Sequence, residues 1–313
     1  MPIDVDTDLP QEAPSLPVIS RGEIAALGAA CCWTVSSLAF ESASKRVGAL
    51  SVNVLRLGVA LVFLSLYTWI ARGLILPLDA SSRTWLWLPL SGLVGFTLGD
   101  LCLFRAYVLV GARLTMLVMS LVPPFTALVG WAALNERLGA TEWLGMAITV
   151  AGVAWVVMER PSSDASSEAR TRIRGLSLGL VATVGQAVGL IMSKHGMGAY
   201  DPFAATQIRI AAGLVGFAGV VSVARRWPRV GAALLDRPAL ARLSLGAVFG
   251  PFIGVSLSLM AVQHTATGIA ATLMAIVPVL IIPPAVLVFK ERVSLRAVAG
   301  AIVAVGGVAL MVR

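Results

Sequence analysis

The chain alternates long apolar segments with short polar ones. Ten apolar stretches can be read in order, each close to the roughly 18–20 residues that a helix needs to cross a hydrocarbon core of about 30 Å. We place them at residues 24–43, 51–71, 85–109, 113–133, 140–158, 175–193, 203–224, 241–261, 267–289 and 295–312. The pattern predicts an all-α integral membrane protein with ten transmembrane helices.

Two polar segments divide this pattern. Residues 1–20 combine acidic side chains with prolines and show no helical periodicity, which predicts a disordered acidic tail. The tail is not expected to be a signal peptide, which needs a basic start and a cleavage site. Residues 159–174 contain Pro161, serines and arginines, as is typical of a linker. The linker separates two predicted five-helix domains, residues 21–158 and 175–313.

The second domain repeats the first. A shift of 155 residues aligns Met119 with Met274, Pro123 with Pro278, and Gly95-x-x-x-Gly99 with Gly250-x-x-x-Gly254, and a shift of 153 residues aligns Trp33 with Gln186 and Arg56 with Arg209. A unit of five crossings begins on one side of the membrane and ends on the other, so a second copy must enter with opposite polarity. We therefore expect two inverted repeats around a central cavity, which is a common plan of secondary transporters, with both termini on the same side.

Composition agrees with a membrane protein. Of the 313 residues, 58% are hydrophobic and 13% are charged, against about 25% charged in a typical soluble domain. The net charge of +8 comes mainly from arginines that lie between spans, where they anchor helix ends, so no nucleic-acid partner is expected. Most of these cations would lie on the side opposite the N-terminus, and the positive-inside rule then places the N-terminus outside the cytoplasm.

Sequence motifs for catalysis are missing. The chain contains no His-Glu-x-x-His, no Gly-x-Ser-x-Gly and no Walker-type phosphate loop. The three cysteines, Cys31, Cys32 and Cys102, fall inside spans without metal-ligand spacing. We expect no enzyme activity, no cofactor, no metal and no direct coupling to ATP hydrolysis.

Two prolines at equivalent positions interrupt predicted spans. Pro123 and Pro278 each lie near the middle of a span, where proline removes an amide donor and kinks the helix. A backbone carbonyl freed at that depth must face protein, water or ligand. The pair is consistent with two broken helices that flank a cavity, and also with plain structural kinks.

Asp100 is the carboxylate that the sequence places nearest the middle of a span. A charged side chain at this depth costs about 2.5–3.5 kcal/mol on insertion scales. Asp100 can bind a substrate amine or carry a coupled proton, or it can be a structural partner of Arg105, Arg56 or a backbone amide. Arg105, five residues further on, does not share a clean helical face with it.

Four further polar side chains are candidate ligands of a substrate. Arg56 and Arg209 can each hold an anionic group, or they can be structural, which their predicted depth near the interface favours. Trp33 and Gln186 lie midway along their spans, and their polar groups need partners in lipid. Ser120, next to Met119 and close to Pro123, is a further candidate.

These motifs resemble a known family. Gly99-Asp100-x-x-x-Phe104-x-Ala106, Met119-Ser120-Leu121-x-Pro123 and Asn135-Glu136-Arg137-Leu138 are similar to motifs of the EamA-type branch of the drug/metabolite transporter superfamily, and the second half repeats Pro278, Glu291-Arg292 and Gly300. The resemblance covers about residues 21–312. The glutamate that drives proton exchange in small multidrug members has no mid-span counterpart here, because Glu41 lies at a helix end.

The resemblance implies a multi-pass carrier in the cell (inner) membrane. It implies ten helices in two inverted repeats and transport, often export, of amino acids, other small metabolites or xenobiotics. The expected partners are a small-molecule substrate and the lipid bilayer, with proton coupling and a monomer or homodimer left open. The resemblance also implies cytoplasmic termini, against the charge count. The alternatives are a multidrug efflux carrier and a non-transporting sensor or assembly protein.

Overall fold

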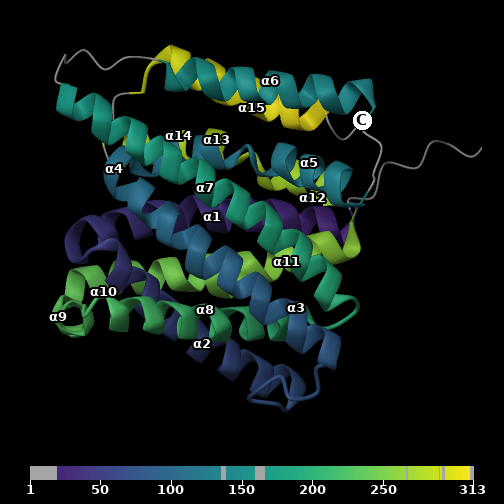
Figure 1. The fold of residues 1–313 in the computed structure, drawn as a ribbon, viewed down its shortest axis with the longest axis vertical. Coiled ribbons are helices and arrows are strands. Elements are labelled where there is room, and N and C mark those ends of the chain that lie inside the picture. Colours follow the sequence, from purple (N-terminus) through teal and green to yellow (C-terminus); the bar gives the residue numbers. More distant parts are fainter. Residues whose placement is uncertain are drawn as a thin grey trace, which may run out of the picture.

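The computed structural model describes residues 20–134, 139–158, 166–265, 267–288, 290 and 293–310. The predicted acidic tail, part of the linker and both Glu-Arg pairs lie outside the described residues. Throughout the described part the elements are helical (Figure 1): α1 (Arg21–Val47), α2 (Ala49–Arg72), α3 (Ser82–Gly92), η1 (Leu93–Gly99), α4 (Asp100–Met119), α5 (Val122–Leu134), α6 (Ala140–Val157), α7 (Ser166–Met197), α8 (Pro202–Val223), α9 (Trp227–Leu235), α10 (Arg237–Ala247), η2 (Val248–Gly254), α11 (Val255–His264), α12 (Thr267–Met274), α13 (Val277–Leu280), α14 (Ile282–Leu287) and α15 (Leu295–Leu310).

Eight of the described helical stretches are long and apolar enough to cross a membrane, and α15 is a shorter apolar helix. One of the eight, residues 82–119, has 38 residues, more than one crossing needs. Gly111 interrupts it with a non-helical conformation, φ 81° and ψ 163°. A left-handed φ of this kind favours glycine, and the break falls between the predicted spans 85–109 and 113–133.

The first helix has clear sequence signals at both ends. Ser20 caps its N-terminus in a capping box with Glu23: the Glu23 backbone N–H donates to Ser20 Oγ (3.2 Å), and the Ser20 backbone N–H donates to Glu23 Oε2 (2.8 Å). Gly48 ends the helix with a φ of 87°. Ser20 Oγ also lies 3.0 Å from Thr265 Oγ1, which joins the start of α1 to the end of α11.

The helices lie side by side in layers (Figure 1). The α6–α15 pair forms one edge of the bundle, α1 and α11 lie near its middle, and α2, α3, α8 and α10 form the opposite side. Glycines let α6 and α15 approach closely, because a Cβ at Gly152 would lie 2.6 Å from the Ala304 nitrogen and one at Gly307 2.5 Å from the Thr149 nitrogen. These two contacts are related by the 155-residue shift.

Two π-helical segments occupy equivalent places in the halves. They are η1 and η2, and they contain the Gly-x-x-x-Gly pairs that the repeat aligns. Helix α7 packs closely against η1: a Cβ at Gly185 of α7 would lie 3.1 Å from Gly99 Cα of η1, and one at Gly189 would lie 3.2 Å from Gly95 Cα. Short π-helical insertions of this kind are frequent at functional sites.

The packing of η2 against α1 follows the same geometry. A Cβ at Gly254 would lie 3.3 Å from Cys32 Cβ, and one at Gly250 would lie 3.1 Å from Ser36 Cβ. Shifting these residues by the repeat offsets gives the η1–α7 contacts. Each half therefore packs its π-helical segment against the first helix of the other half.

Both proline-containing spans are broken helices. The first passes from α4 to α5 through Ser120 and Leu121, just before Pro123. The second passes from α12 to α13 through Ala275 and Ile276, just before Pro278, and breaks again at Ile281.

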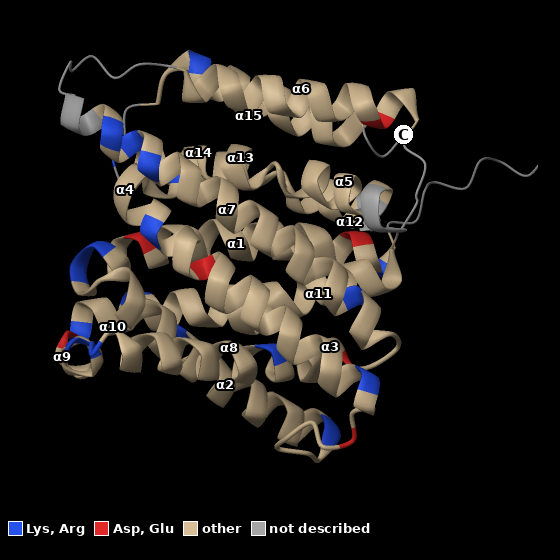
Figure 2. Ribbon diagram, in the orientation of Figure 1, with Lys and Arg blue, Asp and Glu red and all other residues tan. Residues whose placement is uncertain are grey.

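Most charged residues lie toward the two ends of the bundle (Figure 2). Lys and Arg are more numerous at the end where α9 and α10 lie, and α1 begins and α15 ends at the opposite end. At the basic end Arg46 Nε donates to both carboxylate oxygens of Asp236. The backbone N–H of Ala239 and the Arg46 guanidinium hold the pKa of Asp236 below its usual value.

Candidate functional site: a cavity between the two halves

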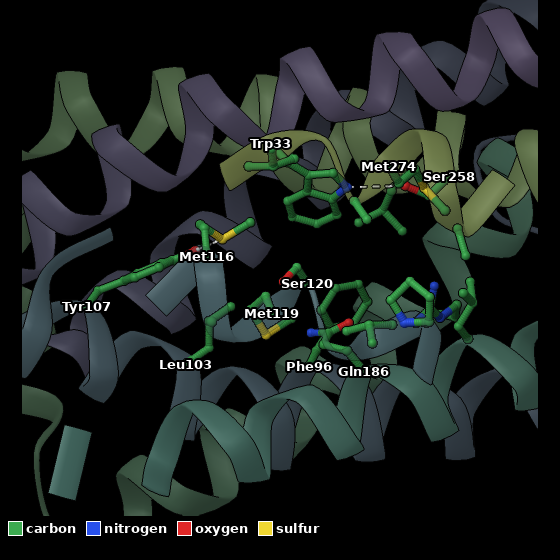
Figure 3. Close-up of a pocket in the computed structure, with 18 residues that line it drawn as sticks. Trp33, Phe96, Leu103, Tyr107, Met116, Met119, Ser120, Gln186, Ser258 and Met274 are labelled. Atoms are coloured by element: carbon green, nitrogen blue, oxygen red, sulfur yellow. Dashed lines mark hydrogen bonds between the residues drawn. The ribbon is translucent and has the colours of Figure 1, made fainter. Parts of the chain in front are cut away.

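A cavity of about 140 Å³ lies at the centre of the bundle (Figure 3). The two halves contribute equally to its lining: Trp33, Phe96, Leu103, Tyr107, Met116, Met119, Ser120, Val122 and Pro123 from the first, and Gln186, Leu190, Arg209, Val255, Ser258, Ala271, Met274, Ala275 and Val277 from the second. Most of the surface is apolar, with a few polar groups, as is usual for ligand pockets.

The lining follows the sequence repeat. Six pairs of equivalent positions face the cavity: Trp33 and Gln186, Leu103 and Ser258, Met116 and Ala271, Met119 and Met274, Ser120 and Ala275, and Val122 and Val277. The two helix breaks thus supply matched walls. Pro123 lies in the lining, whereas Pro278 is buried beside it and does not line the cavity.

Trp33 covers one side of the cavity, opposite Phe96 and Gln186 (Figure 3). Its indole Nε1 donates to Ser258 Oγ at 3.3 Å, and Ser258 Oγ donates to the Gly254 carbonyl at 2.7 Å. The indole N–H is therefore satisfied by the opposite half, and the ring presents an apolar face to the cavity.

Asp100 forms a buried ion pair. It lies at the junction of η1 and α4 with 3% of its surface exposed, and Arg56 Nη2 donates to its Oδ2. Gln186 Nε2 donates to Asp100 Oδ1 at 2.8 Å. Arg56 Nε donates to Asn53 Oδ1 at 3.0 Å. Of the two arginines that the sequence offered as partners, Arg56 pairs with Asp100, while Arg105 is exposed.

Arg56 is held away from the cavity. Its guanidinium lies 4.4 Å from the Phe104 ring centre and 5.2 Å from that of Phe40, within cation–π range. It is 2% exposed, so it is buried inside the bundle. Neither Arg56 nor Asp100 lines the cavity.

Arg209, the repeat equivalent of Arg56, does line the cavity. It is 4% exposed, so it too is buried inside the bundle. Its Nε donates to Ser91 Oγ at 3.0 Å, and its guanidinium lies 5.0 Å from the Phe96 ring centre. The backbone of Gly95 borders it closely, because a Cβ at Gly95 would lie 3.4 Å from Arg209 Nη2.

Sequence reasoning missed several side chains of this region. Ser258, Tyr107 and Val255 line the cavity without a motif to mark them, although the shift of 155 relates Val255 to Asp100.

Glu41, assigned only to a helix end, is buried: it accepts a hydrogen bond from the Ala112 backbone N–H at 2.8 Å and forms an ion pair with Lys45. Its carboxylate thereby caps the helix that follows the Gly111 break. Ser120, by contrast, was predicted and lines the cavity, with its Oγ donating to the Leu117 carbonyl at 2.6 Å.

A bundle of apolar helices around a central, mostly apolar cavity defines a multi-pass membrane protein with a ligand pocket. Its sequence matches the EamA-like transporter family over residues 20–158 and 173–313, and the chain belongs to that family. The resemblance inferred from the motifs is therefore confirmed. The family assignment also makes the chain a membrane transporter of the drug/metabolite type.

Solved structures share the fold. Twenty-six chains match. One of them, titled only as the crystal structure of a protein, superposes with a TM-score of 0.64 at 19% sequence identity, covering 92% of this chain and 95% of its own. At this identity the similarity shows the fold alone. No curated protein matches the sequence.

Proposed function

We propose that this chain is a secondary or facilitative transporter that exports small metabolites, such as amino acids, by alternating access between two inverted five-helix repeats. The observation that carries the proposal is the cavity lined by six pairs of repeat-related positions. If the halves are inverted, exchanging their conformations moves the opening of one shared cavity from one face of the membrane to the other.

Span parity supports the inversion. Splitting residues 82–119 at Gly111 leaves five apolar segments before the linker, and five follow it when the α12–α14 region and α15 each count as one. The exchange of packing partners between η1–α7 and η2–α1 also supports a two-fold relation. The helix breaks at Ser120–Leu121 and Ala275–Ile276 lie beside this cavity, one in each half.

Counterflow in proteoliposomes tests the proposal. Vesicles that contain the purified protein and a millimolar unlabelled substrate should transiently accumulate the labelled substrate from outside, because a carrier exchanges both pools through one site. A panel of amino acids and small organic acids should include at least one with saturable, protein-dependent uptake. Protein-free vesicles are the control, and absence of saturable uptake across the panel would reject transport.

We further propose that the basic end of the bundle faces the cytoplasm, so that both termini lie outside it. A C-terminal alkaline phosphatase fusion should then be active and a C-terminal green fluorescent protein fusion dark. Fusions at Arg229, in the α9 segment of the basic end, should give the opposite readings. A fluorescent C-terminus would instead support the cytoplasmic termini that the family resemblance implies.

A further inference from the structure

The two repeat-related arginines have different electrostatic surroundings. Arg56 forms an ion pair with Asp100, and Asp100 attracts Arg209 only at longer range, without a direct ion pair. The residue that corresponds to Asp100 in the second half is Val255, which is apolar and lines the cavity. Among the residues that the structure describes, no carboxylate forms an ion pair with Arg209 within 4.0 Å.

The cavity therefore has an unbalanced positive charge. Its lining contains one cationic side chain, Arg209, and no carboxylate among the described residues. Arg56, Asp100 and Arg209 together carry a net charge of one positive unit. A buried charge without a close counterion is unfavourable, and an anion that enters the cavity would supply one. Arginine also suits a carboxylate because its fork of N–H donors matches the two oxygens.

The remainder of the lining suits an apolar group. Trp33, Phe96, Met119 and Met274 face one another around the cavity (Figure 3), and the Arg209 guanidinium lies 5.0 Å from the Phe96 ring centre. Methionine side chains adapt to ligands of different shape and make favourable contacts with aromatic rings. A cavity of about 150 Å³ is known to hold a benzene molecule, and this one measures about 140 Å³, so one ring or branched chain fits.

We propose that Arg209 binds the carboxylate of an amphipathic organic monoanion whose apolar body occupies the cavity between Trp33 and the two methionines. The inference rests on the proposed function only in treating this ligand as the transported molecule. An amine of the same size meets no carboxylate among the described lining residues and lies close to a guanidinium, so we expect it to bind weakly. The affinity for a zwitterion should lie between those for the anion and the amine, because the described lining offers its ammonium group neutral acceptors such as Gln186 and Ser258.

Three ligands with the same ring separate these cases: 3-phenylpropionate, L-phenylalanine and phenethylamine. Isothermal titration calorimetry on the full-length protein in detergent should show the anion binding at least tenfold more tightly than the amine, with the zwitterion between them. Arg209→Gln should weaken anion binding at least tenfold. Arg209→Lys, which keeps the charge, should retain part of it. Arg229→Gln removes an exposed arginine at the basic end and should change nothing.

A second variant tests the missing carboxylate directly. Val255→Asp places an acid in the cavity lining, at the repeat equivalent of Asp100, and it should abolish anion binding while raising affinity for the amine. Melting curves establish that each variant is folded. Equal affinity of the wild-type protein for the anion and the amine would overturn the proposal. Wild-type affinity for the anion in folded Arg209→Gln and Val255→Asp proteins would overturn it too. If Arg209→Gln does not fold, the anion affinities of Val255→Asp and Arg209→Lys test the proposal in its place.

The outcome is separable from the transport proposal. Arg209-dependent binding of 3-phenylpropionate without counterflow of any compound supports the site and rejects transport. Saturable counterflow of amines or neutral compounds, without Arg209-dependent anion binding, supports transport and rejects the site.

Discussion

Asp100→Ala is expected to destabilise the protein by about 3–5 kcal/mol, because it leaves the buried Arg56 guanidinium without its counterion. The remaining partners of Arg56 are the Asn53 amide oxygen and two aromatic rings, which do not balance a full charge. Gln186 Nε2 would also lose its shorter hydrogen bond and keep only the Gly95 carbonyl, at 3.4 Å. The loss should appear as a lower melting temperature and an earlier unfolding transition in detergent.

A double-mutant cycle separates the ion pair from the loss of the side chain itself. Arg56→Gln and Asp100→Asn should each be strongly destabilising, whereas the double variant should recover a large part of the stability, since no unpaired charge remains. The Arg46–Asp236 pair supplies the control, because Arg46 is exposed: Arg46→Gln removes the pair, leaves the Asp236 cap of α10 in place and should change the melting temperature little. Additive effects of the two buried substitutions would contradict a direct pair.

The pairing of Asp100 also bears on function. Its two carboxylate oxygens are engaged by Arg56 and Gln186, and it does not line the cavity. We therefore propose that Asp100 is a positioning residue that holds Gln186 at the cavity wall. Loss of transport in Asp100→Asn would then follow from the displaced Gln186 amide rather than from loss of a substrate contact.

The repeat could be predicted from the sequence, because it is a property of the order of residues. The shift of 155 aligned Pro123 with Pro278, and the structure breaks both helices just before these prolines. The same reasoning paired Trp33 with Gln186, which line opposite sides of the cavity. Hydropathy also indicated where the apolar helices lie, but not all of their ends: residues 82–119 form one helical stretch interrupted at Gly111, and α7 begins at Ser166, inside the predicted linker.

The partner of Asp100 could not be predicted. Arg56 precedes it by 44 residues on a different helix, and hydropathy gives the position of a span but not its rotation about its own axis. Rotation is set by side-chain packing between helices, such as the contact of Arg56 with Phe40 and Phe104. For the same reason the sequence could not show that Arg209 faces the cavity while Arg56 does not.

Gly92→Ala is expected to destabilise the contact between α3 and α8 by about 1–3 kcal/mol, as overpacking of a close-packed interior does. A Cβ at Gly92 would lie 2.2 Å from the carbonyl oxygen of Arg209 and 2.9 Å from its carbonyl carbon. Both atoms belong to the backbone of α8, so no side chain can rotate away to make room. The two helices have to separate, and the separation moves Arg209 relative to the cavity.

Gly219→Ala is the matched control, because Gly219 also lies in α8 and a Cβ there would meet nothing within 4 Å. Alanine is the better helix former by roughly 1 kcal/mol, so this variant should melt at or slightly above the wild-type temperature. Melting curves of both variants, with 3-phenylpropionate titrations alongside, check the prediction. A Gly92→Ala protein that melts at the same temperature as the control and binds the anion normally would show that α3 and α8 tolerate a wider separation without moving Arg209. Lower stability together with weaker anion binding would show that the position of the guanidinium depends on this one close backbone approach.

The repeat equivalent of Gly92 is Ala247, so the second half already accommodates a methyl group where the first half cannot. The requirement for glycine at this position therefore belongs to the half that supports the cavity-lining arginine.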